Sequence, residues 1–147
     1  MDQASAARKV LIVEDDQEVA DLMRHCLQHG GFAPTIVHSG ADAIQHVLHH
    51  ETDLMLLDFH LPDMDGFAIL DALEAQGRTI PFIVVTGRDN HRLVVQMMKR
   101  GARDYLTKDG SLIELLPSIV TQTFEQLQRD CRLAEAEQRI HDQNRFL

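Results

Sequence analysis

The sequence predicts a single α/β domain in which helices cover both faces of a parallel β-sheet. Two observations carry this prediction. Short apolar runs alternate five times with segments of helical spacing, and the connections between them are short. Parallel strands joined in this way require right-handed crossovers, which give a doubly wound five-stranded sheet with five helices. A chain of 147 residues with 44% hydrophobic residues is long enough for one core.

Five apolar runs are the expected strands. The first, residues 9–13, is continuously apolar after Lys9 and stops at three consecutive acids, as a strand buried on both faces would. The other expected strands cover residues 33–37, 53–58, 80–85 and 104–107.

A segment with the apolar spacing of a helix follows each expected strand. The first such segment begins at Asp16, which we interpret as its cap, and stops at the glycine pair 30–31. Ser39 is expected to cap the second helix. The remaining helices are expected around residues 67–73, over residues 90–100 and beyond Ser111.

The last helix is expected to extend through residues 125–147, which contain no glycine or proline. Pro117 lies early in this helix, where its ring would clash with the carbonyl four residues back, so an irregular start is expected. Heptad-like spacing with a phase break indicates a marginal coiled coil that links to a missing output domain and allows a homodimer through the last helix and tail. A frayed end of the chain is the alternative.

Composition excludes several classes of protein. The 14 basic and 23 acidic residues give a formal charge of −9, the wrong sign for direct binding of nucleic acid or an anionic membrane. The apolar runs are far shorter than the ~20 residues that span a bilayer, and the first residues carry no apolar signal core. Two widely spaced cysteines do not indicate a secreted disulfide scaffold. A cytoplasmic protein is expected.

Polar residues stand at the carboxyl ends of the expected strands, where open parallel sheets bind ligands. Glu14, Asp15, Asp58, Thr86 and Lys108 occupy these positions. Clustered carboxylates repel one another unless a cation holds them, and an all-oxygen set suits Mg²⁺. Because Mg²⁺ commonly binds phosphate oxygens as well, the pattern predicts a site for a phosphoryl group.

Within this site Asp58 would accept the phosphoryl group, because carboxylates are known nucleophiles that form aspartyl phosphates. Thr86 could hydrogen-bond a phosphoryl oxygen, and Lys108 could pair with another or, before phosphorylation, with Asp58. Taken singly, each residue has a plainer interpretation as a turn former, a helix cap or a surface residue. Their conjunction favours the functional interpretation.

Four motifs together resemble the receiver domain of two-component response regulators, the CheY-like superfamily. They are VLIVEDD at 10–16, LLDFHLPDMDG at 56–66, VVTG at 84–87 and GARDYLTK at 101–108. The resemblance covers about residues 8–124, so we take 1–124 as the receiver domain and 125–147 as a helical extension. It implies the flavodoxin-like strand order 2-1-3-4-5.

The resemblance also implies roles for individual residues. Glu14, Asp15 and Asp58 match the Mg²⁺ ligands, with the backbone carbonyl of His60 as a further ligand. Asp58 matches the phosphoacceptor, and Thr86 and Lys108 match the residues that contact the phosphoryl group. Thr86 and Tyr105 match the switch pair, whose movement changes the surface of the fourth helix and fifth strand.

A protein of this kind would accept phosphate from a histidine kinase or a histidine phosphotransfer protein and control an output domain or protein partner. It would not be an enzyme beyond its own phosphorylation and dephosphorylation. The alternatives are a scaffold that works without phosphate and, with less support, an Mg²⁺-dependent phosphohydrolase. Multiple turnover of a free phosphate ester would identify the phosphohydrolase.

The sequence departs from the family pattern at three positions. Asp109 follows Lys108 where the family usually has proline, often with a cis bond that would cost about 3 kcal/mol without proline. The loop there is therefore expected to differ. Gly87 predicts a looser loop after Thr86, and Glu14 is longer than the aspartate it replaces.

Two further residues are expected to set the lifetime of the acyl phosphate. His60 and Arg88 each lie two positions beyond a residue of the site, Asp58 and Thr86. Their side chains would flank the phosphoryl group and limit the access of water.

Overall fold

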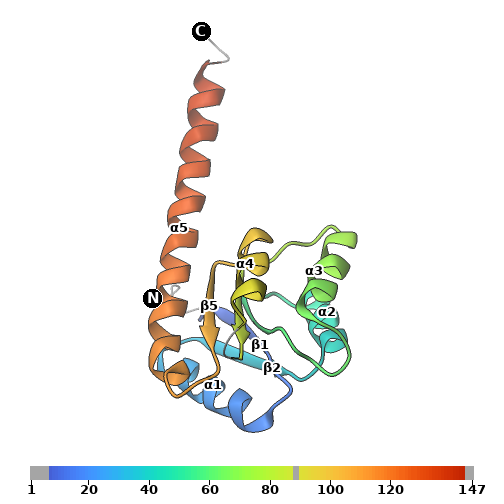
Figure 1. The fold of residues 1–147 in the computed structure, drawn as a ribbon. Helices are drawn as coiled ribbons and strands as arrows, with labels where there is room; N and C mark the ends of the chain where they lie inside the picture. The colour runs from blue at the N-terminus through green and yellow to red at the C-terminus, as the bar shows by residue number, and fades with distance from the viewer. Residues whose placement is uncertain (1–6, 88–89, 145–147) are drawn as a thin grey trace. The chain divides into compact units, whose positions relative to one another are not determined.

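A computed structural model of the chain describes residues 7–87 and 90–144 (Figure 1). The described residues form five strands and five helices in strict alternation. The strands are β1 (Lys9–Val13), β2 (Ala33–Val37), β3 (Leu54–Asp58), β4 (Phe82–Thr86) and β5 (Asp104–Thr107). The helices are α1 (Gln17–His29), α2 (Gly40–His49), α3 (Gly66–Ala75), α4 (His91–Lys99) and α5 (Leu112–Asn144).

The five strands are all parallel and lie in the order β2-β1-β3-β4-β5. This confirms the predicted doubly wound sheet, its flavodoxin-like order and the long last helix. The register aligns the strand ends: Asp58 pairs with Val85, and Thr86 pairs with Thr107. The residues that end β1, β3, β4 and β5 therefore meet at one edge of the sheet.

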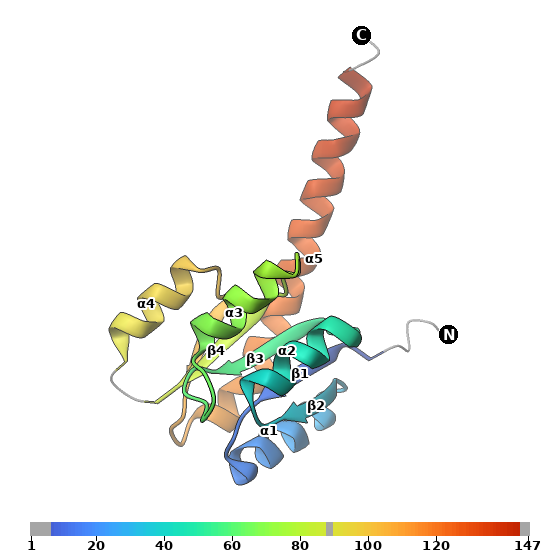
Figure 2. The same cartoon turned by 90° about the vertical axis from the view of Figure 1, so that its right-hand side faces the viewer.

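Helices cover both faces of the sheet (Figure 2). Every residue of β3 and β4 is buried, which is why these strands read as continuous apolar runs. One core cluster joins alternate residues of β1, β3 and β4 to buried residues of α2, α3 and α4. The helix α1 lies on the opposite face and buries Ala20, Met23 and Leu27.

Side-chain caps fix the starts of the first three helices. Asp16 accepts hydrogen bonds from the backbone N–H groups of Glu18 and Val19, which confirms its predicted role at α1. Ser39 caps α2 as predicted, and Asp65 caps α3. All three capping residues have extended backbone, the usual conformation of an N-cap. These caps set the direction in which each helix leaves the edge of the sheet.

The helix α5 passes Pro117 without interruption, which corrects the expected irregular start. Proline has no N–H to give the carbonyl of Ile113, and that carbonyl instead accepts a hydrogen bond from the thiol of Cys26 on α1. The distance from Sγ to the oxygen is 3.5 Å. A residue distant in sequence thus satisfies the group that proline leaves unpaired.

The chain divides into two compact units, one up to Pro117 and one from Ser118 onward. The candidate site lies entirely in the first unit. Among the helices of the described residues, none combines the length and the apolar character needed to cross a membrane.

Candidate functional site

Three carboxylates gather at the carboxyl edge of the sheet. Glu14 and Asp15 follow β1, and Asp58 is the last residue of β3, the neighbouring strand. One oxygen from each of the three side chains lies within 4.8 Å of the others. Glu14 and Asp58 are only 1% and 3% exposed, whereas Asp15 is exposed. The strand ends therefore bring together the acids that the sequence singled out.

Lys108 reaches into this cluster from the end of β5. Its Nζ donates a hydrogen bond of 2.9 Å to Oδ2 of Asp58 and one of 3.0 Å to Oε2 of Glu14. The contact with Asp58 was expected from the sequence, but the contact with Glu14 was not. Glu14 carries one methylene more than aspartate, and its oxygens lie beside the ammonium.

The charges in the cluster do not balance, because one ammonium faces two buried carboxylates. Burial, reinforced by the charge of Asp58, raises the pKa of Glu14 from 4.5 to about 7. Burial alone would lower the pKa of Lys108, but its hydrogen bonds to Asp58 and Glu14 carry that pKa above its ordinary value. A further positive charge would reduce the repulsion between the two buried carboxylates.

The residues present fit a hard divalent cation such as Mg²⁺. The Oε1 atom of Glu14 lies 2.8 Å from Nζ of Lys108, yet it is buried and makes no hydrogen bond. A buried carboxylate oxygen with an unused lone pair, beside exposed Asp15 and an all-oxygen donor set, is the arrangement that such an ion requires.

His60 contributes its backbone to the same site. Its N–H donates a hydrogen bond of 3.2 Å to Oδ1 of Asp58, so both oxygens of Asp58 are held. The His60 ring is exposed and stands edge-on to the ring of Phe59. Arg88, the other residue expected to set the phosphate lifetime, lies outside the described residues.

Thr86 ends β4 beside the cluster and is 1% exposed. Its Oγ1 accepts a hydrogen bond of 3.1 Å from Nδ2 of Asn90, the residue before α4. Tyr105, the expected partner of Thr86 in the switch, lies on the neighbouring strand β5 with 46% of its surface exposed. The sequence interpretation gave Asn90 no role beyond starting the expected helix, although an asparagine at a helix start is a recognisable cap signal.

Asp109 organises the loop after β5. Its carboxylate accepts hydrogen bonds from Oγ1 of Thr107 and from the backbone N–H of Ser111. The bond between Lys108 and Asp109 is trans. Hydrogen bonds of the Asp109 side chain therefore hold this loop in place without a proline.

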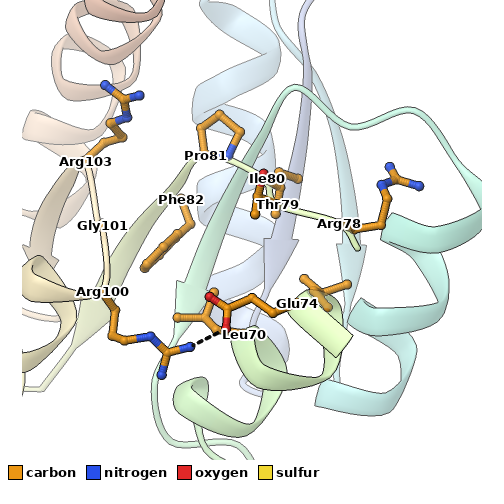
Figure 3. A pocket seen from close by; sticks show the side chains of 11 residues that line it. Leu70, Glu74, Arg78, Thr79, Ile80, Pro81, Phe82, Arg100, Gly101 and Arg103 are labelled. Atoms are coloured by element: carbon orange, nitrogen blue, oxygen red, sulfur yellow. Dashed lines mark ion pairs between the residues drawn. The ribbon is translucent and has the colours of Figure 1, made fainter. Parts of the chain in front are cut away.

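A cavity of about 270 Å³ lies where β4 and β5 begin, at the edge opposite the carboxylates (Figure 3). Arg100 is its most conspicuous lining residue, and its guanidinium pairs with Asp71 at 2.8 Å and Glu74 at 3.5 Å. The same guanidinium lies over the ring of Phe67. These contacts account for Arg100 as a link between α3 and the end of α4.

The family model of the response regulator receiver domain matches residues 10–120. The response regulator MprA of Mycobacterium tuberculosis is 32% identical over 108 residues, which are 74% of this chain and 47% of that protein. The chain thus spans about half the length of the curated relatives it matches.

Solved structures give the same result. The signal receiver domain of a putative Luxo repressor protein from Vibrio parahaemolyticus has a TM-score of 0.75 at 28% identity, covering 86% of this chain and 97% of that one. The receiver domain of the Francisella response regulator 1452 has a TM-score of 0.71 at 26% identity, covering 81% and 98%. With the family model matching most of the chain, this protein belongs to the response regulator receiver domain family.

Proposed function

We propose that this chain is a phosphorylation-activated switch that accepts a phosphoryl group on Asp58. The observation that carries the proposal is the cluster in which Lys108 lies within hydrogen-bond distance of both Glu14 and Asp58. The donor would be a phosphohistidine of a histidine kinase or a histidine phosphotransfer protein. In the transfer, an oxygen of Asp58 attacks phosphorus and the bond from phosphorus to the donor's imidazole nitrogen breaks.

Each residue of the cluster has a defined part in this reaction. Lys108 holds Oδ2 of Asp58 before transfer and can move its ammonium to a phosphoryl oxygen afterwards, where it neutralises the added charge. Thr86 can donate its hydroxyl hydrogen to another phosphoryl oxygen. The proposed Mg²⁺ would be held by Glu14, Asp15, Asp58 and the carbonyl of His60, and it would supply charge neutralisation for the transferring group.

The output of the switch would be the surface formed by α4 and β5. Thr86 adjoins both elements of this surface, because it pairs with Thr107 of β5 and accepts a hydrogen bond from Asn90, the residue before α4. The surface exposes several apolar side chains, with Val95 54%, Met98 43% and Tyr105 46% exposed. A shift of Thr86 toward a phosphoryl group and of Tyr105 inward would change what this surface presents to a partner.

The second unit would connect the switch to its partner. The helix α5 exposes Leu133 and Ile140, which are seven residues apart and 62% and 59% exposed. This spacing suits a coiled-coil contact with a second copy of the helix. We therefore propose that the extension acts as a dimerising linker to an output domain or protein partner.

The proposal is tested by intact mass spectrometry after incubation with Mg²⁺ and acetyl phosphate. One phosphoryl group should be added, and it should be absent from the Asp58→Asn variant and from a sample treated with a chelator. Loss of phosphate in mild hydroxylamine would identify an acyl phosphate. If no adduct forms in any sample, the phosphate-independent scaffold replaces the switch. Repeated turnover of a free phosphate ester would instead support a phosphohydrolase.

A related proposal concerns the lifetime of the phosphoryl group. The exposed ring of His60 lies two residues beyond Asp58, and it would flank the phosphoryl group and limit the access of water. Replacing His60 or Arg88 with alanine should change the rate of dephosphorylation, measured by loss of the phosphorylated mass over time. Unchanged rates in both variants would refute this role.

A further inference from the structure

The start of α4 differs from the starts of α1, α2 and α3. Asp16, Ser39 and Asp65 have extended backbone, with ψ of 113°, 160° and 174°, and each caps its helix with its side chain. Asn90 precedes α4 with φ −105° and ψ 47°, and its side chain makes no capping hydrogen bond. This is unexpected, because asparagine is among the strongest N-cap residues.

The side chain of Asn90 is engaged elsewhere. Its Nδ2 donates a hydrogen bond of 3.1 Å to Oγ1 of Thr86, four residues earlier at the end of β4. Asn90 contacts the first turn of α4 through its backbone, because its carbonyl accepts a hydrogen bond of 3.0 Å from the N–H of Val94. In this conformation the Asn90 side chain binds Thr86 through Nδ2, and its Oδ1 makes no capping hydrogen bond to the first turn of α4.

We infer that Asn90 is a positioning residue that exchanges between these two partners when the switch changes state. Without phosphate it ties the first turn of α4 to Thr86 and leaves that turn without a side-chain cap. When a phosphoryl group on Asp58 draws the Thr86 hydroxyl away, the Asn90 side chain is released. It then turns to accept from the N–H of Arg92 or Leu93, as Asp16 and Ser39 do at their helices.

This inference rests on the proposed function, because the phosphoryl group is what moves Thr86. It adds a route by which the movement reaches α4 that does not depend on Tyr105. The exchange couples one side-chain hydroxyl to the stability of the first turn of a helix whose exposed face is the proposed output surface. Along the chain Asn90 lies between Thr86 and α4, and its side-chain amide contacts Thr86 directly.

The test measures amide hydrogen exchange at Arg92 and Leu93 by NMR, in the full chain with Mg²⁺. Beryllium fluoride serves as the phosphoryl analogue. In the natural sequence it should slow exchange at these amides about three- to tenfold, which is the effect of gaining an N-cap. In Asn90→Ala the amides should exchange fast with and without the analogue.

Two variants distinguish a change of hydrogen-bond partner at Asn90 from a general stabilisation of the protein. Thr86→Val removes the acceptor for Asn90, so the amides of Arg92 and Leu93 should already be protected without the analogue. Asn90→Ser supplies a capping hydroxyl that is too short to reach Thr86, and it should protect the same amides in both states. The two variants act on different residues, so misfolding of one leaves the other as a test.

The result that overturns the inference is equal slowing by beryllium fluoride in Asn90→Ala and the natural sequence. The inference would also be overturned if, with Mg²⁺ and without the analogue, the amides of Arg92 and Leu93 exchanged at the same rate in Thr86→Val and in the natural sequence. Failure of the proposed function is distinguishable, because beryllium fluoride would then leave the natural sequence and Asp58→Asn with the same spectrum. The Thr86→Val comparison needs no analogue and would still decide the question of Asn90.

Discussion

Removing the ammonium of Lys108 should destabilise the metal-free protein. Lys108→Met keeps most of the side-chain volume and leaves Glu14 and Asp58 as two buried carboxylates, 1% and 3% exposed, without their shared partner. Breaking a buried ion pair by removing one member costs about 3–5 kcal/mol. Because the Lys108 side chain is 26% exposed, water softens this penalty, and we expect a loss of about 2–3 kcal/mol near neutral pH.

The size of the loss should depend on pH in a defined direction. The pKa of Glu14 is already raised from 4.5 to about 7 with Lys108 present, and removal of the ammonium raises it further. An acid whose folded pKa is raised contributes most below its unfolded pKa, and that contribution is lost as pH rises through the folded value. The difference between Lys108→Met and the natural sequence should therefore grow as pH rises from about 5 to about 8.

The assay is urea unfolding followed by circular dichroism, at both ends of that pH range, with a chelator or with Mg²⁺ in excess. Mg²⁺ should reduce the loss, because a bound cation replaces the missing positive charge. Lys99→Met is the matched control, since Lys99 is an exposed lysine in the last turn of α4 and should change stability by less than about 0.5 kcal/mol. A loss that is absent, or equal at both pH values and with Mg²⁺, would refute the reasoning.

Three further predictions follow from the same structure. In chelator, the stability of the natural sequence relative to Glu14→Gln should fall as pH rises from 4.5 to about 7 and then level off, by urea unfolding; a flat difference would contradict the raised pKa. Gly66→Ala should cost about 1–3 kcal/mol of unfolding free energy, because a Cβ there would lie 3.0 Å from a phenylalanine ring carbon, whereas Gly110→Ala, with open space, should be nearly neutral in thermal unfolding. Iodoacetamide should alkylate exposed Cys131 before Cys26, whose pKa is raised by burial, as mapped by peptide mass; the reverse order would be evidence against the thiol's contact with α5.

The sheet was predictable because strands buried on both faces leave a simple trace. The apolar run of β1 gave the bounds that the structure has. The bounds of β2 and β5 were also as expected, although β2 is an edge strand with no fully buried residue and β5 buries only Leu106. The expected bounds of β4 were less accurate, since the strand begins at Phe82, after Pro81, and extends to Thr86. An apolar run alone does not distinguish a strand from the residue that leads into it.

The long helix shows what the sequence could not supply. A proline at its sixth residue predicts a disturbed first turn from local rules alone. The disturbance is absent because Cys26, a residue 87 positions earlier in the chain, donates its thiol hydrogen to the orphaned carbonyl of Ile113. Such a contact depends on how α1 packs against the start of α5, and no local pattern specifies it.

The candidate site was predictable in its members and less so in its bonds. Parallel strands that end together bring their terminal residues together, so the grouping of Glu14, Asp15, Asp58 and Lys108 followed from topology. The second bond of Lys108, to Glu14, depends on side-chain reach. The contact of Lys108 with one oxygen of Asp58 was expected, but the hydrogen bond from the His60 backbone to the other oxygen is known only from the structure.

Two departures from local rules occur at the carboxyl edge of the sheet, one after β1 and one after β4. One oxygen of buried Glu14 lacks a hydrogen bond, and Asn90 leaves the first turn of α4 without a side-chain cap. Natural sequences usually satisfy such groups, and exceptions concentrate where a second state satisfies them instead. A cation would use the oxygen of Glu14, and a phosphoryl group that draws Thr86 away would free the amide of Asn90. Both departures are therefore expected of one state of a two-state protein, and both should disappear in the other.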